Sequence, residues 1–248
     1  MTRLVTVAHG TRNPAGNEVA RELTRLAGEV LGMRATAAFV ELCEPSLLEV
    51  LSTSSEPAVV VPLLLSTGHH LQHDLPSSCV SLGPDPLLAR AQVDRLLHGG
   101  AVPGDPVVMV AAGSRDPRAL DDLTLAAAML RREWRGPVAL ATLGGLGPRP
   151  EEVVTPDSAV SPYLLAEGFF ADRLRERCAA ALAVADVLGP HPDVVELVVE
   201  RVRLQLGQRK SMSSMSSSTS SADPSAAAVV AGRDEGWSPT RVRKHRAA

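Results

Sequence analysis

The chain has 248 residues, of which 45% are apolar and only 2% aromatic, and its formal net charge is −3. No apolar run approaches the roughly 18 residues of a membrane span, and the N-terminal stretch lacks the pattern of a signal peptide. Cys43, Cys79 and Cys178 are too widely spaced for a disulfide framework or a thiolate zinc site, so we expect a cytoplasmic enzyme with a core of Val, Leu and Ala.

The first half of the chain alternates apolar runs with segments of helical periodicity. Short apolar runs indicate strands over 4–8, 36–41 and 58–65, and the last is typical of a strand buried on both faces. The spacing of apolar residues predicts helices over 17–32, 45–51 and 85–100. Asn17 is the expected N-cap of the first helix, and Pro45 suits the start of the second.

The same order of elements begins again after residue 100. Strands are predicted over 106–112, 137–143 and 159–165, with helices over 116–134 and 171–185. Strands that alternate with helices indicate right-handed crossovers and parallel sheets. The fold class is therefore α/β, with parallel sheets flanked by helices.

Three pairs of motifs recur in the same order in the two halves. The stretch "AHGTRNP" from residue 8 matches "AAGSRDP" from residue 111, and "PLLLSTGHH" from residue 62 matches "PYLLAEGFF" from residue 162. The stretch "LGPDP" from residue 82 also matches "LGPHP" from residue 188. Three ordered matches indicate an internal duplication, with one domain over 1–100 and a second over 101–206.

The C-terminal segment over 207–248 differs in composition from the rest. It is rich in Ser and then basic, and it shows no sustained apolar period. Such a composition buries too little apolar surface to offset the entropy of ordering, so we expect a disordered tail. We assign it no chemistry and expect a solvated basic arm, with nucleic-acid binding as the less favoured alternative.

Polar side chains follow each of the three strands of the first half. His9 follows the first strand, Glu41 ends the second, and His70 lies just beyond the third. Because the carboxyl ends of parallel strands form one crevice, the three side chains are predicted to converge there. Two imidazoles and a carboxylate suit divalent iron, cobalt, nickel or zinc, and leave coordination positions open. His69 and His73 are candidate auxiliary ligands or proton acceptors; a solvated His-rich loop remains the alternative.

The second half lacks these polar groups. Ala112 stands where the first half has His9, Phe170 answers His70, and the Gly144 region opposite Glu41 contains no carboxylate. Framework residues survive in both halves while the candidate ligands survive only in the first. We therefore expect one functional metal ion per chain, and no role for His191 in binding it.

The stretches "LVTVAHGTRNP", "FVELCEPSL" and "VVVPLLLSTGHHLQHDLP" resemble the class II tetrapyrrole chelatases, specifically the sirohydrochlorin chelatases of siroheme and cobalamin biosynthesis. The resemblance covers about residues 3–201 and implies two tandem chelatase-like domains. It implies insertion of Fe2+ or Co2+, with Ni2+ as a further candidate, into sirohydrochlorin without an organic cofactor. It places the metal-binding and catalytic groups on His9, Glu41 and His70.

Two features depart from the family pattern. The stretch "GPRPEEVVTPDSA" from residue 147 is interrupted by proline and predicts a shortened or missing helix. The doubled histidine at 69 and 70 leaves open which imidazole coordinates the metal.

The flat macrocycle would lie in a cleft between the halves. Phe169 and Phe170 are candidates for its apolar wall, and Arg12 and Arg115 for contacts to the substrate carboxylates. Because the second half would replace a partner subunit, we expect a monomer with pseudo-twofold fused domains.

Two other functions share part of this pattern. The stretch "HGTR" resembles phosphohistidine hydrolases, but their motif places Arg directly before the His, where this chain has Ala8. A non-catalytic protein that binds or delivers a divalent metal would use the same ligands without turnover of a tetrapyrrole.

Overall fold

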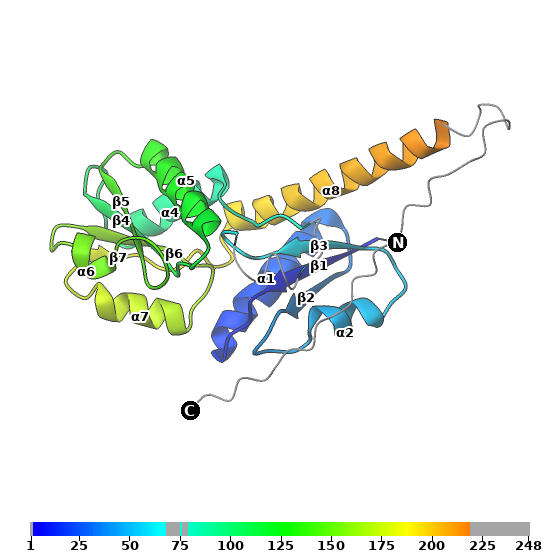
Figure 1. The fold of residues 1–248 in the computed structure, drawn as a ribbon, viewed down its shortest axis with the longest axis horizontal. Helices are drawn as coiled ribbons and strands as arrows, with labels where there is room; N and C mark the ends of the chain where they lie inside the picture. Colours follow the sequence, from blue (N-terminus) through cyan, green and yellow to red (C-terminus); the bar gives the residue numbers. More distant parts are fainter. Residues whose placement is uncertain (1, 68–74, 76–78, 219–248) are drawn as a thin grey trace. The chain divides into compact units, whose positions relative to one another are not determined.

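The computed structural model describes residues 2–67, 75 and 79–218, with side-chain positions up to Gln208. Two parallel sheets form the framework (Figure 1). The first has the order β2-β1-β3 and the second the order β5-β4-β6-β7. Their strands are β1 (Arg3–Ala8), β2 (Ala35–Phe39), β3 (Ala58–Pro62), β4 (Val107–Ala111), β5 (Val138–Thr142), β6 (Ala159–Tyr163) and β7 (Ala183–Val184). The α/β class and the parallel sheets predicted from the sequence are thereby confirmed.

Helices follow the strands in both halves, and proline or a polar cap begins most of them. Their bounds are α1 (Pro14–Leu31), α2 (Leu47–Ser52), α4 (Pro86–His98), α5 (Pro117–Glu133), α6 (Pro150–Val153), α7 (Phe169–Arg177) and α8 (Pro192–Ser218). Helix α6 has four residues, which confirms the shortened crossover that its prolines predicted. Among the described residues, none of the helices combines the length and apolar character that a membrane crossing requires.

The internal duplication is visible in the strand register. Val7 of β1 pairs with Pro62 of β3, and the corresponding Val110 of β4 pairs with Pro162 of β6. The predicted repeat is therefore a repeat of structure, residue for residue along the central strands.

Three helix predictions differ from the structure. Asn17 is not the N-cap of α1: Asn13 is, and its side-chain oxygen accepts a hydrogen bond from the Ala15 N–H. Helix α2 begins after Ser46, which caps it through a capping box with Glu49, so Pro45 precedes the helix. The motif immediately before each helix, rather than its apolar period, sets the start.

The third difference concerns the predicted helix over 171–185. Helix α7 ends at Arg177, with Cys178 as its C-cap, and Ala183–Val184 forms β7 beside β6. The Ala-rich sequence has a high helix propensity, but pairing with the edge of the second sheet overrides it.

Helix α8 also corrects the predicted start of the tail. It continues through residues 207–218, which were expected to be disordered. A helix already nucleated by a packed segment extends beyond that segment at little cost. Residues 219–248 lie outside the described residues, so their predicted disorder stays a prediction.

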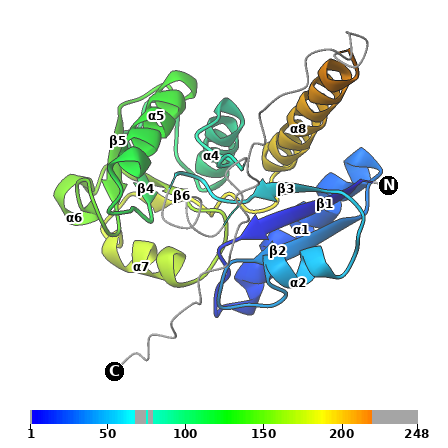
Figure 2. The same cartoon turned by 45° about the vertical axis from the view of Figure 1, so that its right-hand side comes forward.

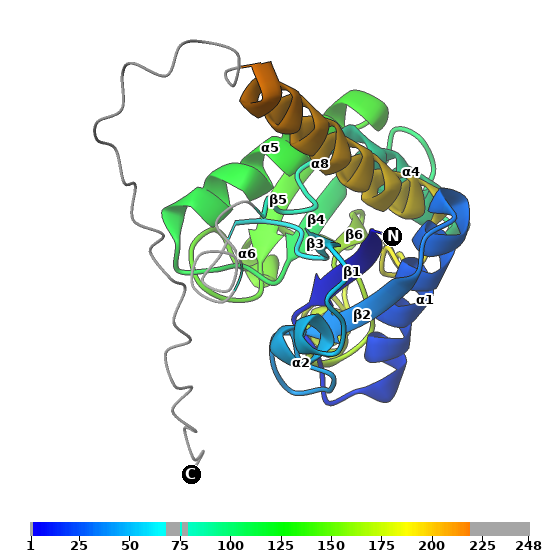
Figure 3. The same ribbon diagram turned by 90° about the vertical axis from the view of Figure 1, so that its right-hand side faces the viewer.

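Alternating strand residues place apolar side chains on both faces of each sheet. In the first sheet, Val5 and Val7 pack with Leu47 and Val50 of α2, while Leu4 packs on the opposite face with α1. Figures 2 and 3 show α1 and α2 on opposite sides of β1 and β2. The second sheet follows the same rule, with α6 and α7 on one face. Both sheets are therefore buried on their two faces, as parallel sheets generally are.

Two helices cross from one repeat to the other. Helix α4, predicted to close the first domain, packs against β6 and α5 of the second half. Helix α8, at the end of the second half, reaches the first sheet, where the Gln205 side-chain amide donates to the carbonyl of Val60 at 3.0 Å. The largest apolar cluster accordingly contains residues of both sheets and both helices, and residues 1–209 form one compact unit. The predicted boundary near residue 100 stays a prediction.

A buried polar pair tests the docking of α4. The Gln92 side-chain amide donates to Ser161 Oγ at 2.8 Å, and both residues are 1% exposed. We expect Ser161→Ala to lower the free energy of unfolding by about 1–3 kcal/mol, because the buried amide loses its acceptor. The double variant Gln92→Met/Ser161→Ala removes both partners and should recover most of this loss. Urea denaturation measures both values, and equal destabilisation of the two variants would contradict the pairing.

Candidate functional site

His9 and Glu41 lie next to each other at the carboxyl end of the first sheet. They follow the adjacent parallel strands β1 and β2, and the backbone N–H of Glu41 donates to the His9 carbonyl at 3.1 Å. His9 Nε2 lies 3.4 Å from Glu41 Oε1, and the two side chains are 44% and 48% exposed. The structure thus brings together two of the three predicted ligands in a position open to solvent.

The orientation of the imidazole favours a shared cation. His9 Nδ1 lies 3.2 Å from the Gly10 carbonyl oxygen, an acceptor. A proton on Nδ1 satisfies that contact and leaves the Nε2 lone pair directed toward Glu41. The lone pairs of His9 Nε2 and Glu41 Oε1 then face each other, and a metal ion or a proton between the two atoms stabilises them. This arrangement is typical of a histidine fixed for coordination by a backbone carbonyl.

Close backbone packing holds the pair in place. Gly10 has a φ of 92°, and a Cβ at this position would lie 1.9 Å from the Glu41 carbonyl oxygen. Leu42, directly after the carboxylate, also has a positive φ of 63°. Only glycine fits where the two loops cross, and the crossing brings the residue before Gly10 beside Glu41.

Asn17, displaced from its predicted capping role, fixes the loop after β1. Its side-chain oxygen accepts from the Thr11 N–H at 3.0 Å, and its amide donates to the Thr11 carbonyl at 2.7 Å. Asn17 is 7% exposed, so these bonds are shielded from water. The loop that carries His9 is therefore anchored by a buried amide from α1.

His70, the third predicted ligand, lies outside the described residues, as do His69 and His73. Within residues 2–67, 75 and 79–218, no group of three or more His, Cys, Asp or Glu side chains gathers to hold a metal. The complete three-ligand set consequently stays a prediction, of which the His9–Glu41 contact is the described part.

The second half repeats the backbone of this site without its side chains. The Leu143 N–H donates to the Ala111 carbonyl just as the Val40 N–H donates to that of Ala8. A Cβ at Gly113 would lie 2.0 Å from the Gly144 carbonyl oxygen, which reproduces the crossing at Gly10. This register places Ala112 and Gly144 opposite His9 and Glu41, as the sequence alignment of the halves predicted. Neither residue has a ligand atom in its side chain.

Phe169 and Phe170 form an exposed aromatic pair at the start of α7. Their ring centroids lie 5.3 Å apart in an edge-to-face arrangement, and they are 65% and 43% exposed. Just before them, a Cβ on Gly168 would lie 3.0 Å from Thr11 Oγ1, so this turn packs against the loop that carries His9. The predicted aromatic wall thus begins beside the candidate metal site.

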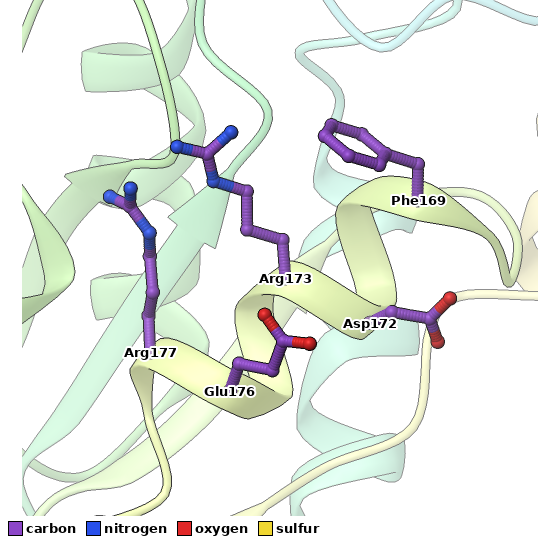
Figure 4. Close-up of a pocket in the computed structure, with 5 residues that line it drawn as sticks. All are labelled: Phe169, Asp172, Arg173, Glu176 and Arg177. Atoms are coloured by element: carbon purple, nitrogen blue, oxygen red, sulfur yellow. The ribbon is translucent and has the colours of Figure 1, made fainter.

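Helix α7 continues this surface with charged residues. Phe169, Asp172, Arg173, Glu176 and Arg177 line a hollow of about 360 Å³ (Figure 4). The Arg173 guanidinium lies 5.9 Å from the centroid of the Phe169 ring, and Figure 4 shows both side chains, with Arg177, extending to the same side. Arg177 is paired with Glu151 at 3.5 Å. Sequence reasoning missed Arg173, although its spacing of four residues from Phe169 placed it on the same helix face.

Arg12 and Arg115 occupy equivalent positions in the two repeats, one residue before the N-caps of α1 and α5. Both side chains are exposed, and neither makes an ion pair within the described part of the chain. Both guanidinium groups are accordingly accessible from solvent, and their contact with substrate carboxylates stays a prediction.

Two of the three cysteines are unsuited to a thiolate site. Burial raises the pKa of Cys79 and of Cys178 to about 11. Both thiols are therefore protonated near neutral pH, and all three cysteines are free.

Comparison with known proteins supports the resemblance seen in the sequence. A curated sirohydrochlorin cobaltochelatase of Methanopyrus kandleri is 32% identical over 81 residues, which cover 31% of this chain and 57% of that protein. The match therefore spans little more than half the length of this relative.

Two solved structures share the fold over most of the chain. A structure described as SirB from Bacillus subtilis with Fe3+ has a TM-score of 0.67 and 26% identity, covering 82% of this chain and 94% of that one. A structure of CbiX, described as the terminal enzyme of siroheme biosynthesis in denitrifying bacteria, has a TM-score of 0.63 and 18% identity, with coverage of 82% and 98%. The latter likeness concerns the fold alone.

The family model described as CbiX matches both repeats, over residues 3–98 and 106–205. Together the two matches cover most of the chain and coincide with the two halves of the duplication. The chain belongs to the CbiX family.

Proposed function

We propose that this protein is a sirohydrochlorin chelatase that inserts Fe2+ or Co2+ into its tetrapyrrole substrate. The observation that carries the proposal is the His9–Glu41 pair, at 3.4 Å, at the mouth of the first sheet only. The names of the Methanopyrus and Bacillus relatives support the substrate class and the handling of metal. Imidazole and carboxylate ligands suit both Fe2+ and Co2+, so the choice between the two metals depends on the geometry of the site and on the supply of each metal.

The chemistry is an exchange of two protons for one metal ion. The hydrated dication gives up its water, and the macrocycle loses two pyrrole protons as its four nitrogens take the metal. No electron is transferred. A neutral imidazole at His9 binds the ion and accepts one of the two pyrrole protons once the ion has left. The carboxylate of Glu41 supplies negative charge that retains the dication, and the second pyrrole proton passes through this exposed carboxylate to solvent water.

The exposure of the pair suits a site that must release its metal. Both side chains are nearly half exposed, and three protein ligands leave positions open for water or for a macrocycle nitrogen. A closed four-ligand site would bind the ion too firmly to hand it on. We therefore expect weak, rapidly exchanging binding of the metal before insertion.

The surface at the start of α7 supplies the features that a flat, polyanionic ring requires. Phe169 and Phe170 offer apolar edges and faces, and Arg173 places a cation over one of these rings. Arg12 and Arg115 add two further exposed guanidinium groups. Planar guanidinium groups pair well with carboxylates, so these three arginines are the candidates for contacts to the substrate carboxylates.

Loss of either ligand should abolish or reduce metal insertion. We expect His9→Ala to lower the rate at least about 100-fold, because both the ligand and the proton acceptor are removed. Glu41→Gln should have a smaller effect, since it keeps an oxygen ligand but loses the charge. An anaerobic spectral assay with sirohydrochlorin and Fe2+ or Co2+ measures both. His98→Ala is the matched control, because His98 is exposed on α4 and, among the described residues, hydrogen-bonds to the Asp94 carbonyl of its own helix. Near wild-type turnover by His9→Ala would contradict the site.

The asymmetry of the repeats predicts one metal ion per chain. Ala112 and Gly144 provide no ligand atoms, so we expect calorimetric titration with Co2+ to give a stoichiometry of one. Binding should be lost in His9→Ala and retained in His98→Ala. Two equivalent sites, or full binding without turnover of sirohydrochlorin, would instead favour a protein that stores or delivers metal.

Removal of the Arg173 guanidinium should weaken binding of the macrocycle alone. We expect Arg173→Ala to raise KM for sirohydrochlorin about three- to tenfold with little change in kcat, because an exposed ion pair contributes modestly and equally to ground state and transition state. Steady-state kinetics test this. Arg132→Ala, an exposed arginine at the end of α5, is the control, and an unchanged KM in Arg173→Ala would remove the hollow of α7 from the substrate site.

A further inference from the structure

Leu42, directly after Glu41, has a backbone conformation that leucine rarely adopts. Its φ is 63°, and it is the only non-glycine residue with a positive φ in the described part of the chain. In the left-handed region the Cβ of an L-residue lies too close to the following carbonyl oxygen, so this conformation costs free energy. Strain of this kind is concentrated at functional sites, where the surrounding structure maintains it.

The second half has glycine at the equivalent position. The register that places Gly144 opposite Glu41 also places Gly145 opposite Leu42, and the φ of Gly145 is 70°. The backbone therefore makes the same turn in both halves, and glycine adopts it without strain. The turn alone favours glycine, so the leucine of the first half requires another explanation.

The surroundings of this turn differ between the halves. In the second half a Cβ on Gly145 would lie 2.0 Å from the Ser114 carbonyl oxygen, which accepts from the Leu146 N–H at 2.8 Å. In the first half the corresponding carbonyl belongs to Thr11 and accepts from the Asn17 side-chain amide at 2.7 Å. The second half thus excludes a side chain from the turn, whereas the first half accommodates a leucine.

The leucine side chain gains little from packing within the chain. Leu42 is 53% exposed, and it belongs to none of the three apolar clusters that the described residues form. About half of an apolar side chain is therefore left in contact with water, which is unfavourable in addition to the backbone strain. Contacts in the free protein do not compensate for the conformation of this residue.

Leu42 adjoins the loop that carries His9. A Cβ at Gly10 would lie 1.9 Å from the Glu41 carbonyl oxygen and 3.6 Å from the Cys43 backbone nitrogen. These two atoms belong to the residues on either side of Leu42 in the chain. The turn before the aromatic pair of α7 contacts the same loop one residue after Gly10. Exposed apolar side chains from both halves thus adjoin the loop of a candidate metal ligand.

We propose that Leu42 is a substrate-binding residue, whose side chain packs on the tetrapyrrole ring when the ring binds over His9 and Glu41. This inference rests on the proposed function. The ring itself is apolar and its carboxylates lie on the periphery, so a ring placed at the metal ligands requires apolar contacts there. Removal of the exposed part of Leu42 from water offsets the strain of its backbone on binding. The second half has no candidate ligands, and it has glycine at this position.

A series at position 42 in the full-length chain tests this. Leu42→Gly and Leu42→Asn both introduce residues that tolerate a positive φ, and both remove the apolar side chain. We expect each to raise KM for sirohydrochlorin about three- to tenfold, with kcat within about twofold of wild type. Leu42→Met keeps an apolar side chain and should leave KM within about twofold. Titration of metal-free sirohydrochlorin, followed by its absorbance, should give the same order of affinities.

Two further measurements separate substrate contact from a structural role. Co2+ affinity should equal that of wild type in every variant, because the side chain of Glu41 is retained. The melting temperature of Leu42→Asn should rise by about 2–4 °C, because the strain is relieved and little packing is lost. Leu97→Ala is the control, since Leu97 is a 44% exposed leucine in the last turn of α4, and it should leave KM unchanged.

The outcomes distinguish this inference from the proposed function. Unchanged KM and unchanged sirohydrochlorin affinity in Leu42→Gly and Leu42→Asn would overturn the substrate contact, even if metal insertion by the wild type is confirmed. Weaker Co2+ binding or a lower melting temperature in Leu42→Asn would also overturn it, because the leucine would then support Glu41 or the core. If the wild type binds sirohydrochlorin but does not metallate it, the proposed function fails, while the affinity series still decides the role of Leu42.

Discussion

The exchange of α4 and α8 between the repeats is the constraint on which the remaining structure depends. Each helix leaves the half that encodes it and covers the sheet of the other, and their apolar side chains merge into one cluster with both sheets. Separation of the two halves would therefore uncover apolar residues of both sheets. The hydrogen bonds of Tyr163 and Asp122 with the backbone of residues 65 and 67 link the two halves. They are supported by a shared core rather than by a surface interface, which would allow relative motion.

Within that framework the two halves have the same backbone at the site but different side chains. The glycine crossings at Gly10 and Gly113 are nearly identical, with φ values of 92° and 83°, so both repeats retain the backbone that the site requires. The first half carries the candidate ligands on this backbone. The second half has Ala112 and Gly144 at the equivalent positions, so the two halves share this backbone but differ in their side chains.

Sequence patterns predicted the framework and part of the site. The central strands were readily predicted because they are buried on both faces and are therefore continuous apolar runs, such as Val107–Ala111. The pairing of His9 with Glu41 also followed, since adjacent parallel strands end at the same edge. Local signals failed where tertiary contacts decide: Asn17 closes a loop instead of capping a helix, and the segment around Ala183 joins a sheet despite its helix propensity.

Sequence reasoning found neither the exchange of helices nor the hydrogen bonds of Asp122 and Tyr163 with the backbone that follows β3. Periodicity shows that α4 has an apolar face but not which sheet that face covers. The aspartate and tyrosine lie in ordinary amphipathic and buried segments, and their partners are backbone atoms, which leave no trace in a residue pattern.

The second sheet offers one more consequence, for protein design. Gly144 has no positive φ, and a Cβ there would meet only the Ala112 carbonyl oxygen, at an ordinary contact distance of 3.7 Å. The backbone at this position therefore accommodates a Cβ without strain, so the scaffold that carries Glu41 in the first half is preserved in the second. An engineer who wishes to build a second coordination centre into this chain has a template already shaped by the first.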